Sequence, residues 1–195
     1  MRRSCVFIRI VDEGLERFLR AQVPLPEDAA DVSFEIPSSN WAAALSRVTV
    51  NLFLFDVTRS SQPNRAAVRR VDETGKGERR APQPMVELDY LVSAWAGNPR
   101  DEHQLLGSVL SRIAGLDMLP PEYLPRPLSS SVHLTFVEDE RHRARDIWNG
   151  AGGTLKAGFA MQVTVAADTF GWTPEPAAVT SIEGATRASN GSKSG

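Results

Sequence analysis

The chain of 195 residues has one cysteine, three histidines and no long apolar run. The single cysteine, Cys5, cannot form a disulfide within the chain, which excludes a disulfide-stabilised scaffold and fits a reducing compartment. A membrane-spanning helix needs roughly 20 apolar residues in succession, and no stretch approaches that length. Charged Arg9, Asp12 and Glu13 interrupt the short apolar start, so we do not expect a secretion signal there.

The residues that usually carry catalysis or bind metals do not form a recognisable pattern. His103, His133 and His142 lie far apart, and none has a second ligand at the spacing of a zinc site. No Gly-x-Ser-x-Gly elbow marks a nucleophilic serine. Glu87 and Asp89 share one face of an expected strand, but we interpret them as surface carboxylates facing a basic neighbour rather than an acid–base pair. The sequence thus indicates no metal, no cofactor and no enzyme activity.

Composition is otherwise ordinary. Apolar residues make up 42% of the chain and charged residues 24%, and the formal net charge is -2. This composition excludes a wholly disordered chain and a collagen-like repeat, and the balanced charge gives no sign of a dedicated nucleic-acid binder. A chain of this length usually forms one domain and buries roughly 70% of its unfolded surface. We therefore expect one domain followed by a tail.

Apolar periodicity predicts a sheet with helices packed on it. Val48–Val57 and Met85–Ala96 are apolar on both faces, which predicts two long strands joined as an antiparallel hairpin. Asn98 followed by Pro99 predicts the start of a helix. The other expected elements are helices at Ile8–Leu19, Trp41–Leu45, His103–Ile113 (ended at Gly115) and Glu138–Trp148, and strands at Asp31–Ile36, Val132–Val137 and Gly158–Asp168. The expected fold class is α/β of the α+β type: one domain with a mixed, mainly antiparallel sheet and Asp31–Ile36 at an edge.

A polar insert, Thr58–Pro84, joins the two long strands and is far longer than a hairpin needs. It carries seven basic and three acidic residues, a net charge of +4, and no aromatic residue. Its few apolar side chains cannot stabilise a fold of their own. We therefore expect an extended arm, mobile in the free subunit and ordered on a protein partner, whose arginines bind carboxylates at two points. An ordinary solvated loop is the other interpretation.

Two further functions stay open at this level. Gly150–Thr154 lacks the Gly-Lys-Ser/Thr of a phosphate-binding loop, so we interpret it as a flexible turn. With Arg141 or Arg145 it would otherwise serve a small enzyme or ligand-binding module for a phosphorylated ligand. The arginine-rich arm, Arg59–Arg80, would serve a nucleic-acid-binding module, although it offers no aromatic for base stacking. The last residues are rich in Pro, Ala, Ser and Gly, which predicts a flexible tail.

Three segments resemble one protein family closely. They read DVSFEIPSSNWAAALSRVTVNLFLFDVTRS at Asp31–Ser60, LDYLVSAWA at Leu88–Ala96 and DEHQLLGSVL at Asp101–Leu110. The run Ile-Pro-Ser-Ser-Asn-Trp followed by the strand Thr-Val-Asn-Leu-Phe-Leu is the most specific part of the likeness. The chain resembles the cap, or tube-and-sheath terminator, proteins of phage-tail-like contractile injection systems, a family long catalogued as a domain of unknown function. The likeness extends from the first helix to about Asp168.

This resemblance implies a structural subunit without a catalytic residue. A cap of this family closes the baseplate-distal end of tube and sheath, so we expect a homo-oligomeric, hexameric ring that contacts the inner tube protein and the sheath protein. It implies no cofactor, no membrane and no nucleic acid, and assembly in the cytoplasm into a particle that is retained there or released by lysis. The expected division of the chain is a cap domain at 1–172, with its arm at 58–84, and a flexible tail at 173–195. The candidate assembly interface comprises Arg65, Arg69, Arg70, Arg79, Arg80, Asn40 and Trp41.

Overall fold

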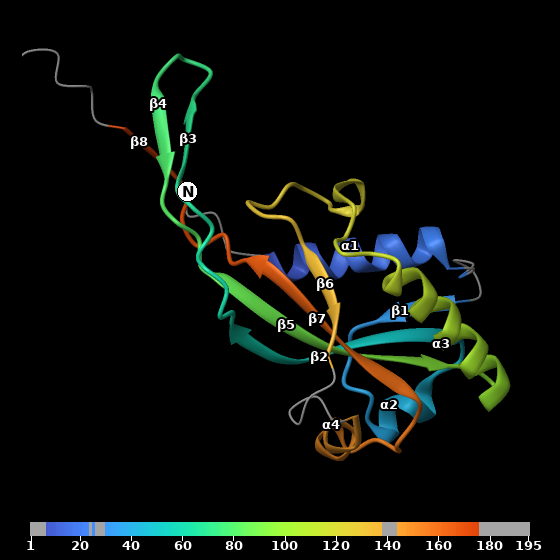
Figure 1. Cartoon of the computed structure of the whole chain (residues 1–195). Helices are drawn as coiled ribbons and strands as arrows, with labels where there is room; N and C mark the ends of the chain where they lie inside the picture. Colours follow the sequence, from blue (N-terminus) through green and yellow to red (C-terminus); the bar gives the residue numbers. More distant parts are fainter. Residues whose placement is uncertain (1–6, 24, 26–29, 138–143, 176–195) are drawn as a thin grey trace, which may run out of the picture.

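The computed structural model describes residues 7–23, 25, 30–137 and 144–175. The body is a five-stranded sheet, and a smaller three-stranded sheet projects from one end of it as an arm (Figure 1). Only β1 and β2 pair in parallel; the other neighbouring strands of the two sheets are antiparallel. In spatial order the body strands are β1 (Ala30–Ser33), β2 (Val48–Arg59), β5 (Met85–Trp95), β7 (Gly158–Ala166) and β6 (His133–Phe136), and the arm strands are β3 (Val68–Val71), β4 (Gly77–Arg80) and β8 (Trp172–Pro174). The predicted α/β class with a mixed, mainly antiparallel sheet is confirmed.

One face of the body sheet carries the larger core. The helix α1 (Phe7–Gln22) lies along this face and buries Val11 and Leu15 completely. They pack against alternate residues of β5, among them Leu88 and Tyr90, both with no exposed surface. The apolar residues of α1 recur at helical spacing, so a helix places them all on the side that faces the sheet.

A polar contact ties α1 to this core. The Tyr90 hydroxyl donates a hydrogen bond of 2.7 Å to Oδ1 of Asp12. Burial raises the pKa of the Asp12 carboxyl, and burial with the neighbouring carboxylate raises the pKa of Tyr90 well above its usual value. The contact gives the enclosed hydroxyl the hydrogen-bond partner that a buried polar group requires.

The opposite face of the body sheet holds a smaller core built on tryptophans. Trp95 of β5 meets Trp41 of α2 (Ser39–Ala44) and Trp148 of α4 (Ala144–Ala151) edge-on, with ring centroids 5.2 and 6.0 Å apart. Trp148 is only 1% exposed, so it pins α4 to the sheet as the sequence predicts. The first residues of the expected helix, 138–143, lie outside the described residues.

The helix α3 (Pro99–Ala114) follows β5 and packs on the larger core. The side chain of Asn98 caps it by accepting a hydrogen bond of 3.0 Å from the backbone N–H three residues on, and Gly115 ends it, as predicted. Val109 is completely buried, but the adjacent Leu110 is 39% exposed. The helix therefore contacts the core along a narrower stripe than its sequence suggests.

The chain between α3 and β6 is irregular, as its prolines predict. It contains a short 3₁₀ turn, η1 (Pro121–Tyr123), which packs on α1. The ring of Tyr123 meets Phe18 edge-on at 5.4 Å, and its hydroxyl accepts a hydrogen bond of 2.9 Å from Nε2 of Gln22. This segment therefore covers α1 along the flank that carries Gly14, Phe18 and Gln22.

The predicted edge strand Asp31–Ile36 does lie at an edge, but it is shorter than expected. β1 ends at Ser33, and Ile36 is 54% exposed rather than turned inward. Beyond Ser33 the side chain of Asn51 donates its Nδ2 hydrogen to the carbonyl of Glu35 at 3.2 Å. A side-chain contact thus takes the place of the backbone ladder, which the alternating sequence pattern cannot reveal.

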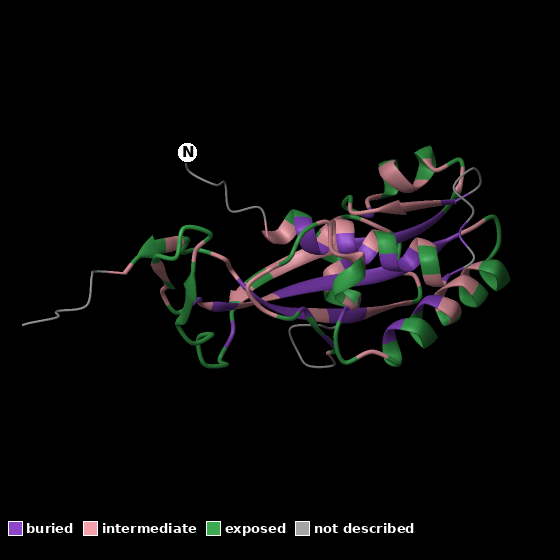
Figure 2. Ribbon diagram, turned by 90° about the horizontal axis from the view of Figure 1, so that it is seen from above, coloured by how far each residue is buried: buried purple, intermediate pink, exposed green. Residues whose placement is uncertain are grey.

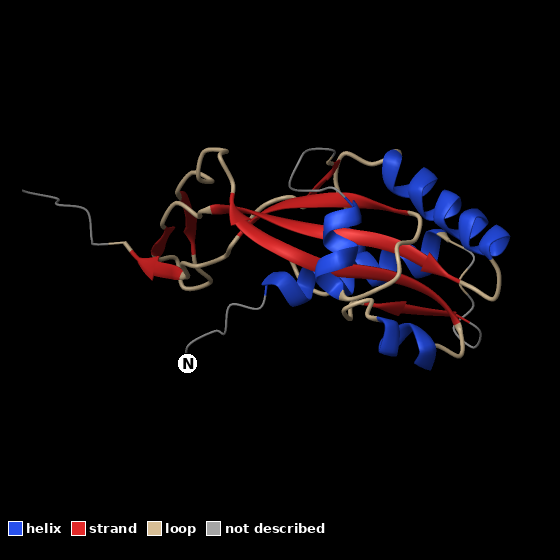
Figure 3. Ribbon diagram, turned by 90° about the horizontal axis from the view of Figure 1, so that it is seen from below, coloured by secondary structure: helices blue, strands red, loops and turns tan. Residues whose placement is uncertain are grey.

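The body and the arm differ in what covers them. The described helices lie over the two faces of the body sheet and none lies on the arm (Figure 3). The central strands of the body are mostly buried, whereas the arm is exposed or half-buried (Figure 2). None of the described helices is both long enough and apolar enough to cross a lipid bilayer.

Candidate assembly surfaces

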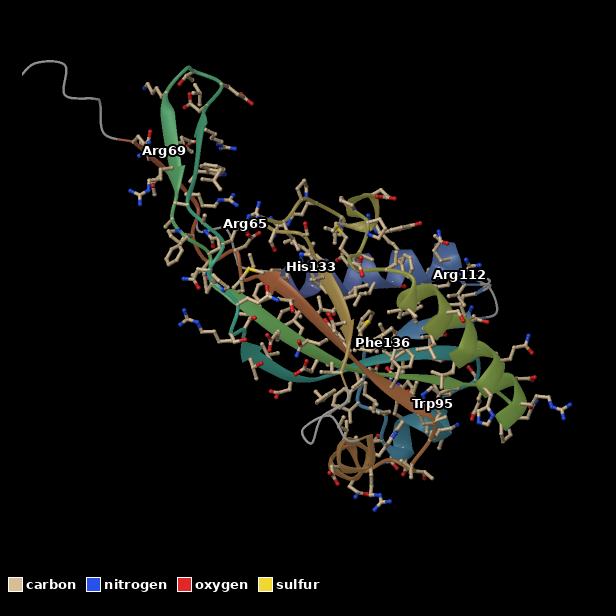
Figure 4. The ribbon with its side chains drawn as sticks, in the orientation of Figure 1. Arg65, Arg69, Trp95, Arg112, His133 and Phe136 are labelled. Carbon is tan, nitrogen blue, oxygen red and sulfur yellow. The ribbon has the colours of Figure 1, made fainter. Side chains whose placement is uncertain are left out.

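The structure divides the seven predicted interface residues between two ends of the molecule. The arm follows the end of β2, while α2 precedes its start, so the two groups lie at opposite ends of the body sheet (Figure 1). Figure 4 shows Arg69 on the arm and Arg65 nearer its base. The arm group is Arg65, Arg69, Arg70, Arg79 and Arg80, and the α2 group is Asn40 and Trp41.

The arm is a regular sheet, which differs from the structureless segment that its composition predicts. β3 and β4 pair from Val68 opposite Arg80 to Val71 opposite Gly77. β8 then pairs with the other edge of β4. The insert alone lacks the apolar surface to hold a fold. The third strand, from a distant part of the chain, supplies further backbone pairing and the ring of Trp172.

This third strand also changes the expected start of the C-terminal tail. The tail was expected from residue 173, but Thr173 and Pro174 belong to β8. The backbone N–H of Glu175 donates a hydrogen bond of 2.8 Å to the carbonyl of Gly77. Residues up to 175 are therefore part of the arm, and the rest of the expected tail lies outside the described residues.

One face of the arm is organised around Trp172. The guanidinium carbons of Arg70 and Arg80 lie over its ring, 4.2 and 4.7 Å from the ring centre. Arg70 also forms an ion pair of 2.8 Å with Glu78. An exposed cation–π contact contributes about 0.5–1 kcal/mol. The insert has no aromatic residue, but β8 brings one to it.

The other face of the arm is crossed by Glu175. Its carboxylate forms an ion pair of 2.8 Å with Nε of Arg69 on β3, which it reaches across β4. The crossing passes over Gly77, where an added Cβ would lie 3.1 Å from Oε2 of Glu175. A glycine at this position therefore leaves room for the carboxylate that links the two outer strands.

The hairpin turn between β3 and β4 is closed by Asp72. Its Oδ1 accepts hydrogen bonds from the backbone N–H groups of Thr74 at 2.9 Å and Lys76 at 2.8 Å. These bonds, chiefly that from Lys76, lower the pKa of Asp72. Gly75 adopts φ of +84°, the left-handed region that glycine favours. The Asp-x-x-Gly spacing was the one local signal of a structured arm.

The base of the arm is fixed by a buried amide. Gln83 is only 1% exposed. Its Nε2 donates to the carbonyl of Phe170 and its Oε1 accepts from the N–H of Phe170, both at 3.0 Å. This pair of bonds joins the segment before β5 to the segment before β8 at the base of the arm.

Three of the five arm arginines have partners within the arm or at its base, and two do not. Arg69 and Arg70 form the ion pairs above, and Arg80 lies beside Trp172 and 4.0 Å from Asp168. The side chains of Arg65 and Arg79 have no hydrogen-bond or ion-pair partner among the described residues, and both are exposed. Only these two are free to bind a partner without breaking a contact of the arm.

The two candidates on α2 have different surroundings. Asn40 is exposed. Trp41 is half-buried, and its backbone N–H donates a hydrogen bond of 3.2 Å to the side chain of Ser38, which caps the helix. Because its ring packs on Trp95, Trp41 is mainly a core residue. Asn40 is therefore the surface residue of this pair.

A groove of about 410 Å³ lies beside α2. Trp95 and Ala42 line it together with Leu155, which is 60% exposed. Lys156 sits 4.2 Å above the Trp95 ring and forms an ion pair with Glu102. The charges in the groove are thus paired, and what it offers a partner is apolar surface.

The structure places two of the three histidines and the carboxylate pair Glu87 and Asp89. No group of three or more His, Cys, Asp or Glu within the described ranges is arranged to hold a metal ion. His103 and His133 are exposed, and His142 lies outside those ranges. Glu87 and Asp89 do share a face, and both accept hydrogen bonds from Nε2 of the neighbouring Gln162, at 3.5 and 3.0 Å. The interpretation as surface carboxylates is wrong for Asp89, which is only 1% exposed.

The glycine-rich run Gly150–Thr154 is a packed turn at the end of α4. Gly152 has a positive φ of 67°, and the N–H of Gly153 donates to the carbonyl of Trp148. An added Cβ at Gly153 would lie 2.3 Å from the carbonyl oxygen of Pro37. The run thus packs on neighbouring backbone, as expected of a turn; Arg145 is exposed, and Arg141 lies outside the described residues.

A comparison with known families bears on this fold. Residues 10–181 match the model of the family described as the Pvc16 N-terminal domain. The chain belongs to the Pvc16 N-terminal domain family. The matched span includes most of α1 and both sheets, so the arm and the strand β8 that completes it lie within the family's region.

Two solved structures share the fold. One is the PVC sheath/tube terminator of an extracellular contractile injection system in its extended state, with a TM-score of 0.64, 21% identity, and coverage of 93% of this chain and 64% of that chain. The other is the tube-terminating cap of the anti-feeding prophage, with a TM-score of 0.60, 18% identity, and coverage of 90% and 60%. The chain spans less than two thirds of the length of either. No curated protein sequence matches it. The expected likeness to cap and terminator proteins is confirmed at the level of the fold.

Proposed function

We propose that this protein is a structural subunit of the cap that closes the distal end of the tube and sheath in a contractile, phage-tail-like injection particle. The observation that carries the proposal is a fold shared over 93% of the chain with a sheath/tube terminator. The match of residues 10–181 to the Pvc16 N-terminal domain family stands beside it. Six copies form a closed ring. The partners are further copies of the chain, the inner tube protein and the sheath protein, without membrane or nucleic acid.

The placement of the candidate residues supports a ring. A head-to-tail contact joins two different surfaces of successive subunits, and such contacts close into a ring when the rotation permits. The arm, with the free Arg65 and Arg79, and the α2 end, with the exposed Asn40, are different surfaces at opposite ends of the body. The arm reaches the neighbouring subunit, and assembly takes place in the cytoplasm, after which the particle is retained or released by lysis.

Neither alternative function gains support from the described residues. A phosphate bound at Gly150–Thr154 would meet a turn whose Gly153 already packs on the carbonyl of Pro37. A single-stranded nucleic acid bound to the arm would be held by an aromatic on which its bases stack, and Trp172 is covered by two guanidinium groups. The cap therefore stands as the one function that the geometry favours.

Electron microscopy of particles from cells that lack the chain tests the proposal. We expect tubes and sheaths of irregular length without density at the distal end, and restoration of a six-fold end structure by the wild-type chain. Normal, closed ends in the absence of the chain would contradict the proposed function. Closed ends with another symmetry would contradict the ring of six alone.

A further inference from the structure

We propose that one face of the arm binds a carboxylate of a neighbouring protein subunit beside Arg69 and Arg79. This inference rests on the proposed function, and it narrows the assembly surface of the arm from five arginines to one face. The face contains Arg69 and Val71 of β3, Arg79 of β4 and Thr173 of β8.

The strand register brings two like charges together on this face. Arg69 lies directly opposite Arg79 in the β3–β4 pair. Directly opposed residues of an antiparallel pair point to the same side, with Cβ atoms roughly 4.5–5.5 Å apart. Two guanidinium groups at this spacing repel each other, and like charges in this position destabilise a sheet. The arm keeps an unfavourable pair that a carboxylate would relieve.

The chain supplies a carboxylate to only one of the two. Glu175 pairs with Arg69. On the other side of Arg79 the cross-strand neighbour is Thr173, whose hydroxyl donates its hydrogen bond of 3.0 Å to the backbone carbonyl of Arg79 and not to a side chain. The exposed side chain of Arg79 therefore has a cation, Arg69, and a small side chain, Thr173, as its cross-strand neighbours.

An exposed apolar side chain adjoins the free arginine. Val71 lies on the same face as Arg69, two residues along β3, and is 68% exposed. A partner that places a carboxylate on Arg79 would also cover this valine. The opposite face also has an exposed valine, Val68, but no unpaired arginine, because its Arg70 is paired with Glu78 and stacked on Trp172 and its Arg80 lies over the same ring.

The partner is a protein carboxylate rather than a nucleic-acid phosphate. The aromatic residue of the arm, Trp172, lies on the opposite face under Arg70 and Arg80, so the proposed face has no ring on which a base can stack. Asp72 and Glu73 at the adjoining turn would repel a chain of phosphates. A single carboxylate avoids that repulsion and matches the fork of a guanidinium.

Cross-linking within the assembled particle tests this contact directly. In the variant Arg79→Lys, a zero-length carbodiimide couples the introduced amine to any carboxylate in contact with it, and mass spectrometry identifies the joined peptides. We expect a link from position 79 to an Asp or Glu of a neighbouring subunit, and no such link in the wild-type particle. A link only to Glu175 of the same chain, or none in particles with closed ends, would overturn the proposal.

Charge reversal gives a second test. Arg79→Glu should reduce the fraction of particles with closed ends about tenfold, the loss expected when attraction at one contact becomes repulsion, and Arg79→Gln should reduce it less. Arg100→Glu, an equal charge change at an exposed site on α3, is the control and should cap normally. Melting temperatures of the purified variants should equal that of the wild type.

The outcomes separate this inference from the proposed function. If Arg79→Glu caps particles as well as the wild-type chain does, the proposed contact at Arg79 is overturned, whereas the proposed cap function is upheld. Equal losses in Arg79→Glu and Arg100→Glu also overturn the proposed contact, because net charge would then be the cause. So would salt-dependent retention of duplex DNA that Arg79→Glu abolishes without affecting capping. Failure of the wild-type chain to restore closed ends would instead refute the proposed function.

Discussion

The body sheet and the arm sheet share an antiparallel ladder but depend on different interactions. Leu88, Leu91 and Val92 of β5 have no exposed surface, so both faces of the central strand are covered. All four residues of β3 are exposed, and the arm is held by ion pairs and by contacts to Trp172. Full burial of a large apolar side chain stabilises by about 1.5–3 kcal/mol, whereas an exposed ion pair contributes roughly 0–1 kcal/mol.

The comparison shows which interactions stabilise each sheet. The body obtains it from apolar burial, which salt does not weaken. The arm obtains it from a short third strand and from charges at the surface, which salt screens over a distance of about 10 Å at 0.1 M. The stability of the arm sheet should therefore depend on salt concentration, whereas the stability of the body sheet should not.

The largest expected difference between the two sheets follows from truncating a buried leucine. Leu88→Ala should lower the free energy of unfolding by about 2–5 kcal/mol, because it removes transfer energy and leaves a cavity. Val68→Ala, on the arm where Val68 is 41% exposed, should change it by less than about 0.5 kcal/mol. Denaturant melts followed by circular dichroism measure both, and equal losses would break the comparison.

The next effect concerns the hydrogen bond between α1 and the body sheet. Tyr90→Phe removes the hydroxyl that donates to Asp12 and should cost about 1–2 kcal/mol, since a half-buried carboxyl loses its partner. Denaturant melts at neutral pH check this. An unchanged midpoint would show that water replaces the hydroxyl.

The same contact predicts a pH dependence with a definite sign. The folded pKa of Asp12 is raised by burial, so ionisation of Asp12 disfavours the folded state. Its contribution to stability is greatest below the unfolded pKa of about 3.9 and is lost as pH rises through the folded value. Stability of Asp12→Asn relative to wild type should therefore increase across that range, and a constant or falling difference would contradict the assignment.

A smaller and more local effect is expected from the aromatic residue of the arm. Trp172→Ala removes both cation–π contacts and should destabilise the arm sheet by roughly 1–2 kcal/mol without shifting the melting temperature of the body. Because trypsin cleaves after arginine, limited proteolysis reports the change at Arg69, Arg70, Arg79 and Arg80. Faster cleavage there is expected, with Trp172→Phe intermediate. Cleavage of Trp172→Ala at the wild-type rate would show that Trp172 does not stabilise the arm sheet.

The smallest effect concerns Gly77. Gly77→Ala places a Cβ 3.1 Å from Oε2 of Glu175, so the carboxylate must shift and its ion pair with Arg69 weakens, at a cost of a few tenths of a kcal/mol. In Glu175→Gln the same glycine change should have almost no effect. A double-mutant cycle read by proteolysis of the arm measures the coupling, and a coupling of zero would show that the crossing does not matter.

The body could be predicted from the sequence because its signals are local. The apolar runs of β2 and β5, and the pair Asn98 and Pro99 at the start of α3, each lie within a few residues. The arm could not be predicted in the same way, because its third strand is a three-residue segment that pairs with a strand far upstream. No periodicity marks so short a strand.

The sequence predicts which arginines the arm carries, but not how their side chains are paired. Net charge identified the arm arginines as a group, but only the register shows that Arg69 faces Arg79 and that Arg70 faces Glu78. The reason for a glycine at position 77 is clear only from the structure, where the side chain of Glu175 passes over it. Trp41 was a candidate interface residue because it ends the run Ile-Pro-Ser-Ser-Asn-Trp. Its edge-on contact with Trp95 makes it mainly a core residue.

Amide hydrogen exchange of the free chain tests the central claim, that β8 orders the arm before any partner binds. The full chain should protect amides of β3 and β4, a chain ending at residue 175 should protect them equally, and a chain ending at residue 171 should lose that protection while β5 and β7 keep theirs. Unprotected β3 and β4 amides in the full chain would contradict the claim and return the arm to a segment that folds only on its partner.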